Sequence, residues 1–107
     1  MIKTTINLKA GCLKKIHALS DENRLKIINL LMKEPSCVNS LSEKLGLKQY
    51  NISKHLRILD QAELVLHRKD GQKRIYSLPD NLLKQIPKNK NKFVLPCCTF
   101  DFNRLKT

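Results

Sequence analysis

Three apolar residues near the start of the chain are spaced three apart: Leu13, Ile16 and Leu19. This spacing places them on one face of a helix, which we expect over residues 8–19. Ser20 and Asp21 offer side-chain oxygens that can cap a second helix, and Pro35 ends it. The apolar positions of the second helix cover several of its sides, as in a central helix: Leu25, Ile27, Ile28, Leu30, Leu31 and Met32.

Two further helices joined by a glycine are expected next. Ser36 can cap a short third helix with three apolar positions: Val38, Leu41 and Leu45. Gly46 supplies the left-handed residue that ends this helix, and a fourth helix follows over residues 49–62. Its apolar stripe is Ile52, Leu56 and Leu59, and its polar and cationic stripe is Tyr50, Ser53, Lys54 and Arg57. Two short helices joined by such a turn indicate a helix-turn-helix.

A β-hairpin is expected after the fourth helix. Residues 64–69 and 73–78 are prone to form strands, and the Asp-Gly pair within the turn 70–72 favours a tight hairpin. Four cations flank its tip: Arg68, Lys69, Lys73 and Arg74. The expected fold is therefore mainly α with a small β-hairpin, a winged helix-turn-helix.

The last part of the chain holds weaker signals. Asp80 can cap a short fifth helix, stopped by Pro87, with three apolar positions: Leu82, Leu83 and Ile86. Residues 88–92 are polar and basic without apolar anchors, which indicates a mobile linker. Residues 93–105 regain apolar side chains, so we expect them to dock on the body or on a partner subunit.

Charge gives the first indication of function. Lys and Arg outnumber Asp and Glu by 21 to 9, a formal net charge of +12 in 107 residues. A field of this sign favours a polyanion, with nucleic acid ahead of an acidic membrane surface. No apolar run approaches the roughly 20 residues of a membrane span, and no secretory signal pattern is present. We expect a cytoplasmic protein with no membrane partner.

The fourth helix has one apolar and one polar face, as expected of a recognition helix that binds in the DNA major groove. Gln49 and Asn51 can pair with adenine edges, Arg57 with guanine or phosphate, and Ser53 and Lys54 with phosphate or base. The cationic hairpin then meets the flanking backbone or the minor groove. The predicted DNA-contacting set is Gln49, Tyr50, Asn51, Ser53, Lys54, His55, Arg57, Arg68, Lys69, Lys73 and Arg74.

The same residues also permit other interpretations. A polar helix face can simply be solvated, and His55 is more often a packing or hydrogen-bonding residue than a catalytic one. An RNA-binding or nucleoid-coating protein would share the charge but show no preferred duplex sequence. An enzyme is disfavoured, because no acid is placed to orient a base and no phosphate-cradling loop or paired-carboxylate spacing is present.

Several segments resemble the ArsR/SmtB family of metal-sensing repressors. The similar segments are 19–28 (LSDENRLKII), 52–59 (ISKHLRIL), 62–65 (AELV), 68–72 (RKDGQ) and 76–78 (YSL). The resemblance spans about residues 12–84. It implies a homodimer, joined through the first and last helices, that binds an operator of dyad symmetry until an inducer releases it. Residues 1–87 would then form the DNA-binding and dimerisation domain, and residues 88–107 a basic linker and cysteine-containing tail.

The chain also departs from this family. Glu63 stands where Gly is usual, so we expect a non-glycine residue in the left-handed conformation at a cost of about 1 kcal/mol. Lys48 replaces the usual Ser cap of the recognition helix. The fifth helix looks short, which limits its share in dimerisation.

Cysteine thiols are the candidate inducer ligands. The family's best-known site has Cys-Val-Cys, but this chain has Cys37 and, two residues later, Asn39; a second family site on the last helix lacks its His here. The adjacent pair Cys97 and Cys98 suits trivalent arsenic or antimony, with Cys37 or Cys12, of the same or the other subunit, as a third ligand. Thiol oxidation and other soft metals are the alternatives, and DNA binding itself needs no cofactor.

Overall fold

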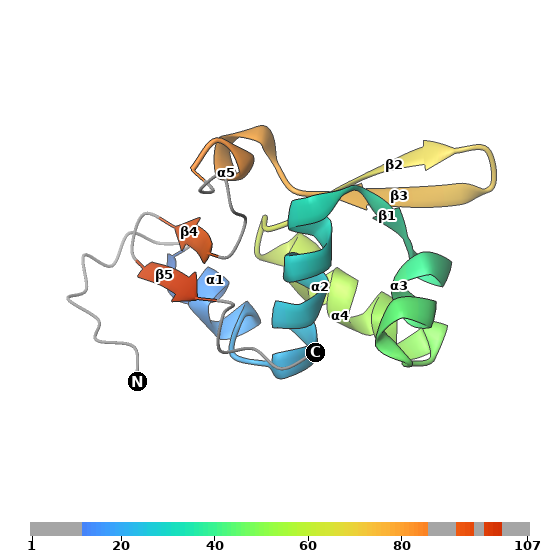
Figure 1. Ribbon diagram of the computed structural model, residues 1–107, viewed down its shortest axis with the longest axis horizontal. Helices are drawn as coiled ribbons and strands as arrows, with labels where there is room; N and C mark the ends of the chain where they lie inside the picture. The colour runs from blue at the N-terminus through green and yellow to red at the C-terminus, as the bar shows by residue number, and fades with distance from the viewer. Residues whose placement is uncertain (1–11, 86–91, 96–97, 102–107) are drawn as a thin grey trace.

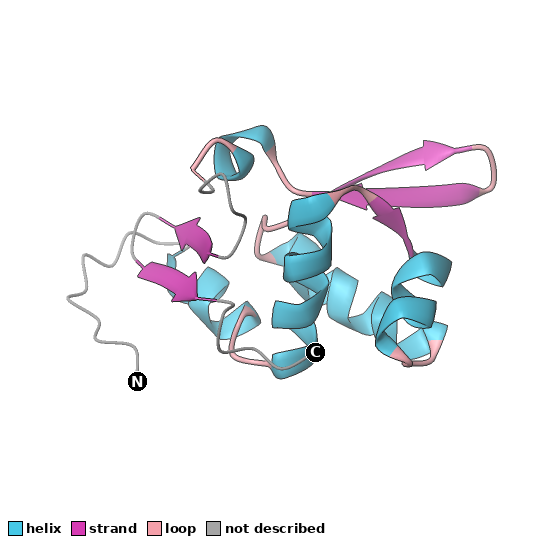
Figure 2. Cartoon of the chain, in the orientation of Figure 1, coloured by secondary structure: helices cyan, strands magenta, loops and turns pink. Residues whose placement is uncertain are grey.

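The computed structural model describes residues 12–85, 92–95 and 98–101, and it has the expected mainly helical architecture with a small antiparallel sheet (Figure 1). Its helices are α1 (Cys12–Ala18), α2 (Glu22–Lys33), α3 (Val38–Leu45), α4 (Gln49–Gln61) and α5 (Asp80–Leu83). Its strands are β1 (Ser36–Cys37), β2 (Leu66–Asp70), β3 (Lys73–Ser77), β4 (Lys92–Leu95) and β5 (Cys98–Asp101). The hairpin of β2 and β3, here called the wing, projects away from the helices (Figure 2).

The helix α2 begins as its sequence predicts. The Asp21 carboxylate accepts hydrogen bonds from the backbone N–H groups of Asn23 (2.8 Å) and Arg24 (3.1 Å), so it satisfies donors that the first helical turn leaves free. Ser20 has another role, because its hydroxyl donates to the His17 carbonyl at 2.6 Å. The buried residues of α2 form the centre of the core: Ile27, Ile28, Leu31 and Met32.

The helix-turn-helix consists of α3 and α4. Gly46 adopts φ 66° at the end of α3, and the Leu47 N–H then donates to the Ser42 carbonyl at 3.2 Å. The side chain of Ser42 closes the same turn by donating to the Leu47 carbonyl. Lys48 precedes α4 without a side-chain cap, as its lack of a capping oxygen implies.

The expectation that Ser36 caps the third helix is wrong. Ser36 lies in β1, opposite Tyr76 of β3, and is only 5% exposed. Its hydroxyl turns back to the Glu34 carbonyl at 3.4 Å, and α3 starts after Cys37 with no side-chain cap. Ser36 therefore serves as a strand residue that pairs with β3, and it does not cap α3.

The wing confirms the predicted hairpin with shifted strand bounds. Asp70 pairs with Lys73, and Gly71 takes φ 65° in the two-residue turn between them. Leu64 and Val65, expected at the start of the first strand, lie in the core before it, at 0% and 1% exposure. β3 pairs with β2 on one edge and with β1 on the other.

The fifth helix is short, as expected, but its cap is not the predicted one. Pro79 occupies the cap position without a side-chain hydrogen bond, and Asp80 is already the first helical residue. α5 ends at Leu83, so it does not extend to the predicted Ile86, and Ile86 and Pro87 themselves lie outside the described residues. Residues 8–11 of the first predicted helix also lie outside them.

The first strand of the C-terminal segment, β4, packs against the helices. β4 pairs with β5, and Phe93 and Leu95 join the same buried cluster as the helices. Docking of this segment is therefore confirmed for β4. Lys92, expected in the linker, is instead the first residue of β4; residues 88–91 of that linker are outside the described ranges.

The turn after α4 contains the expected left-handed residue. Glu63 has φ 60°, and its N–H donates to the Asp60 carbonyl at 3.0 Å. The Leu64 N–H donates to the Leu59 carbonyl at 3.0 Å, which completes the helix end. A residue with a Cβ is strained in this conformation.

We predict that Glu63→Gly raises the free energy of unfolding by about 1 kcal/mol, because glycine adopts this conformation without the Cβ clash. Thermal unfolding should show a rise in melting temperature of about 4–8 °C. Glu63→Ala is the matched control, since it removes the charge and keeps the Cβ. Equal stabilisation by both variants would assign the effect to the carboxylate instead.

Candidate nucleic-acid interface

The outward side of α4 carries the predicted base-reading residues. Six of them are exposed: Gln49, Tyr50, Asn51, Ser53, Lys54 and Arg57. On the opposite side, Ile52, Leu56 and Leu59 are fully buried. The helix is therefore attached to the body by its apolar side and presents its polar side to a ligand, as a helix in the major groove requires.

Two side-chain contacts order the exposed end of α4. The Gln49 amide donates to Asn39 Oδ1 of α3 at 2.9 Å, which ties the first residue of the recognition helix to its neighbour. The Lys54 ammonium lies 5.4 Å from the centre of the Tyr50 ring, within the range of a cation–π contact. Asn39 was not among the predicted residues, because the spacing of α3 alone does not reveal a partner on α4.

His55 belongs to the contact between α4 and the body. It is half-buried, and its Nδ1 lies 3.4 Å from Nη1 of Arg24 on α2. Nε of the same arginine donates to the Ala18 carbonyl at 2.5 Å. Arg24 thus links the end of α1 with α2 and α4, in agreement with a local hydrogen-bonding role for His55.

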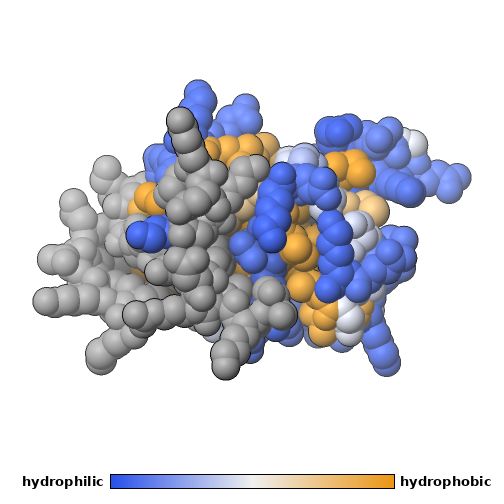
Figure 3. Space-filling model, in the orientation of Figure 1, coloured by the Kyte–Doolittle hydropathy of each residue, from blue (hydrophilic) through white to orange (hydrophobic). Residues whose placement is uncertain are grey.

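The strand register divides the four predicted cations of the wing between two faces. Lys69 lies opposite Arg74, and Arg68 lies opposite Ile75. Because side chains alternate along a strand, Lys69 and Arg74 share one face while Arg68 and Lys73 share the other. All four cations are exposed, and Figure 3 shows hydrophilic residues over the wing.

A groove of about 260 Å³ separates α4 from the wing. Its lining residues are Val38, Ser53, Leu56, Arg57, Asp60, His67, Arg74 and Tyr76. His67 Nδ1 lies 3.9 Å from Asp60 Oδ1, and the His67 and Tyr76 rings are 5.5 Å apart. The groove thus joins Ser53, Arg57 and Arg74 of the predicted set with two residues, Asp60 and His67, that were not predicted.

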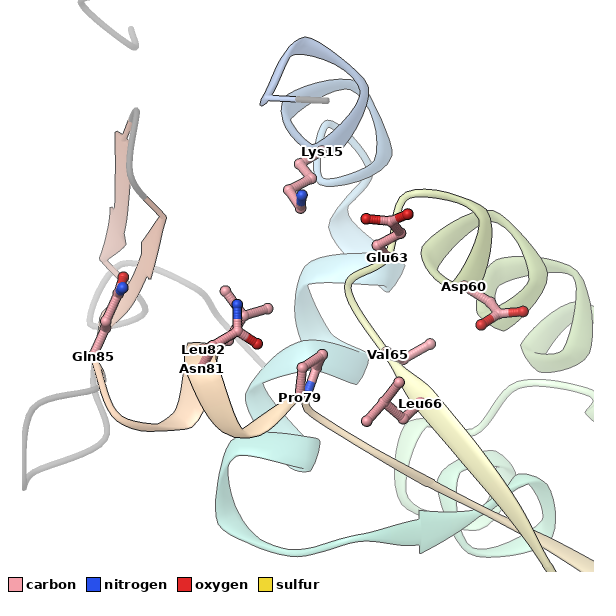
Figure 4. A pocket seen from close by; sticks show the side chains of 9 residues that line it. All are labelled: Lys15, Asp60, Glu63, Val65, Leu66, Pro79, Asn81, Leu82 and Gln85. Atoms are coloured by element: carbon pink, nitrogen blue, oxygen red, sulfur yellow. The ribbon is translucent and has the colours of Figure 1, made fainter. Parts of the chain in front are cut away.

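A larger cavity of about 480 Å³ lies between α1, the turn after α4 and the α5 region (Figure 4). Lys15 and Glu63 line one side of it, and Leu82 and Gln85 line another. The ionisable residues among its described lining are Lys15, Asp60 and Glu63.

The predicted thiol ligands are distributed over both ends of the molecule. Cys37 is half-buried ahead of α3, whereas Cys12 begins α1 and Cys98 begins β5. Figure 1 shows α1 and β5 at one end of the long axis and α3 at the other. Cys97 lies outside the described residues. Within the described ranges, no three His, Cys, Asp or Glu residues lie close enough to hold a metal ion.

No helix among the described segments is long and apolar enough to cross a membrane.

Comparison with known proteins gives consistent matches. The model of the bacterial regulatory protein arsR family matches residues 21–66, from α2 to the start of β2. The arsenical resistance operon repressor of Staphylococcus aureus is 40% identical over 73 residues, which is 68% of this chain and 70% of that protein. HlyU from Vibrio cholerae is 33% identical with a TM-score of 0.65, over 70% of this chain and 82% of its own.

A further structure shows the fold alone. The homodimeric winged helix-turn-helix DNA-binding domain of a possible ArsR-family regulator from Mycobacterium bovis has a TM-score of 0.66 at 23% identity, over 69% of each chain. The matched segments contain the exposed stripe of α4 and the residues that hold it in place. The chain belongs to the ArsR family of winged helix-turn-helix transcriptional repressors, which are DNA-binding proteins and not enzymes.

Proposed function

We propose that a homodimer of this chain binds an operator of dyad symmetry in the reducing cytoplasm and leaves it when a trivalent arsenical binds cysteine thiolates. The observation that carries the DNA-binding part is α4 itself, whose apolar stripe is fully buried while its polar stripe is exposed beside a cationic wing. Two such helices, one per subunit, can enter successive major grooves about 34 Å apart.

Exposed leucines support the dimer. Leu13 of α1 is 59% exposed and Leu83 of α5 is 39% exposed, on the two elements that the family resemblance assigns to dimerisation. Both side chains are already partly buried, so covering them with a second copy contributes less than the roughly 1.5–3 kcal/mol gained when a fully exposed leucine is buried.

We predict that Leu13→Asp shifts the protein from dimer to monomer, because a charge at a buried apolar contact is costly. Sedimentation equilibrium at micromolar concentration measures the change. Tyr50→Ser is the control, since Tyr50 lies on the DNA-facing side of α4 and its loss should leave the mass unchanged. A Leu13→Asp protein that stays dimeric would place the subunit contact elsewhere.

Base recognition is assigned to the start of α4. Asn39 holds the amide of Gln49, and Asn51 is exposed one position after Tyr50. Amide side chains at these positions can each form two hydrogen bonds with an adenine edge. Lys73 at the wing tip supplies a charge that meets phosphate and carries no sequence information.

We predict that Asn51→Ala lowers the preference for operator over scrambled duplex by about tenfold, the loss expected for one bidentate base contact. Lys73→Ala should weaken binding to both duplexes alike and reduce the salt dependence. Fluorescence anisotropy with DNA from the protein's own promoter measures both. If Asn51→Ala weakened both duplexes equally, α4 would not be the base-reading helix.

The chemistry of vicinal thiols and the similarity to an arsenical resistance repressor both support an arsenical inducer. The S. aureus relative is named for an arsenical resistance operon, and this chain carries the vicinal thiols Cys97 and Cys98. Soft metals and metalloids prefer thiolate ligands. Cys12 is favoured over Cys37 as a third ligand within one chain, because α1 and β5 lie at the same end of the molecule.

Coordination at the tail would act on the body through β4. Phe93 and Leu95 of that strand are part of the core, so ordering of the neighbouring thiols is transmitted to packed side chains. A ligand that binds one arrangement of the dimer better than another shifts the population toward it.

We predict that arsenite releases the wild-type protein from DNA and no longer does so when Cys97 and Cys98 are both replaced by Ser. Cys37→Ser is the control and should keep the response. Release by peroxide alone would identify a redox switch, and release by Cd²⁺ alone another soft-metal sensor. Arsenite release that survives the double substitution would show that the tail thiols are not the ligands.

A further inference from the structure

Two arginines line the groove between α4 and the wing. Arg57 reaches it from α4 and Arg74 from β3, and Asp60 is the one carboxylate among the described residues that line it. Within the described part of the chain, neither guanidinium takes part in a salt bridge or a side-chain hydrogen bond. Two unpaired arginines that face one small space from different elements form a receptor for an anion.

The remaining polar groups of the groove are suited to the same ligand. Ser53 contributes a hydroxyl from α4, one helical turn before Arg57. His67 contributes an imidazole from β2, and its ring packs against Tyr76 at 5.5 Å. Lys69, which lies opposite Arg74, adds a further positive charge on the same wing face.

We infer that this groove binds one phosphate of the DNA backbone, with Arg57 and Arg74 as a clamp across it and with Ser53 and His67 as additional hydrogen-bond donors. The inference rests on the proposed DNA binding and specifies one of its contacts. A backbone phosphate is the occupant because the groove opens between the exposed stripe of α4 and the wing, where a DNA strand passes from the major groove to the next contact.

Asp60 opposes the binding of an anion in this site. Its carboxylate lies 3.9 Å from Nδ1 of His67, inside the groove that a phosphate would enter, and like charges at short range repel. The cationic side chains that line the same groove are Arg57 of α4 and Arg74 of β3. Two positive charges against one negative charge leave the groove favourable to an anion.

Operator affinity of the full-length protein, measured by anisotropy at one pH and one ionic strength, tests whether a phosphate enters the groove. We expect Asp60→Asn to bind the operator several-fold more tightly than wild type, because the amide no longer repels the phosphate. Glu22→Gln is the control, since Glu22 lies on α2 outside the groove and its loss should leave the affinity nearly unchanged. An Asp60→Asn protein with the affinity of the control would overturn the inference.

A double-mutant cycle tests the clamp. Arg57→Gln and Arg74→Gln should each weaken operator binding about tenfold. The double variant should weaken it by clearly less than the product of the two single losses, because both arginines contact the same phosphate. The losses of operator affinity from Arg74→Gln and Arg68→Gln should multiply in the double variant, because Arg68 lies on the other face of the wing. Independent effects of Arg57 and Arg74 would overturn the shared site. A wild-type protein that does not prefer its operator to scrambled DNA would instead refute the proposed function.

Discussion

Burial of Ile52, Leu56 and Leu59 is the constraint on which the DNA-facing surface depends. These three residues lie on one stripe of α4, and each is removed fully from water. Because a helix is periodic, fixing this stripe also fixes the direction in which Ser53 and Arg57 point. Lys48 gives α4 no side-chain cap, so packing and not capping determines the orientation of the helix.

The same packing explains how the polar groups come together. α4 approaches the wing along Ser53, Arg57 and Asp60, and the twofold alternation of the strands turns His67 and Arg74 toward it. The site is thus made of two periodic elements, a helix and a hairpin, whose repeats meet at one groove. Arg24 supports the arrangement from the body through His55.

Local signals made much of this predictable from the sequence. The Asp21 cap, the glycine after α3, the two stripes of α4 and the Asp-Gly turn of the wing each depend on residues a few positions apart. The strand β1 was missed, because a two-residue strand exists only through its pairing with β3, some 40 residues later in the chain. The pairing of β4 with β5 was missed as well, since no glycine or asparagine marks a turn between them.

In the candidate site, too, some features follow from local sequence patterns and others depend on tertiary packing. The exposed residues of α4 follow from a 3.6-residue repeat, which the sequence displays directly. Asp60 and His67 become partners only when the helix and the wing are packed together, and the separation of Arg68 from Arg74 requires the strand register. Asn39 likewise reaches Gln49 across a turn whose geometry the sequence indicates but whose contacts it does not specify.

The short strand β1 has a mechanical consequence. By joining the wing to the segment that leads into α3, it makes the wing and the helix-turn-helix one rigid piece, so neither can relax alone. In the proposed homodimer, any rotation of one subunit would therefore move its recognition helix and its wing together relative to the DNA. A tilt of about 5° at one end of a body 42 Å long displaces the other end by about 4 Å, close to the spacing of successive base pairs. A small rotation between the two proposed subunits would thus be enough to take both recognition helices out of register with the operator.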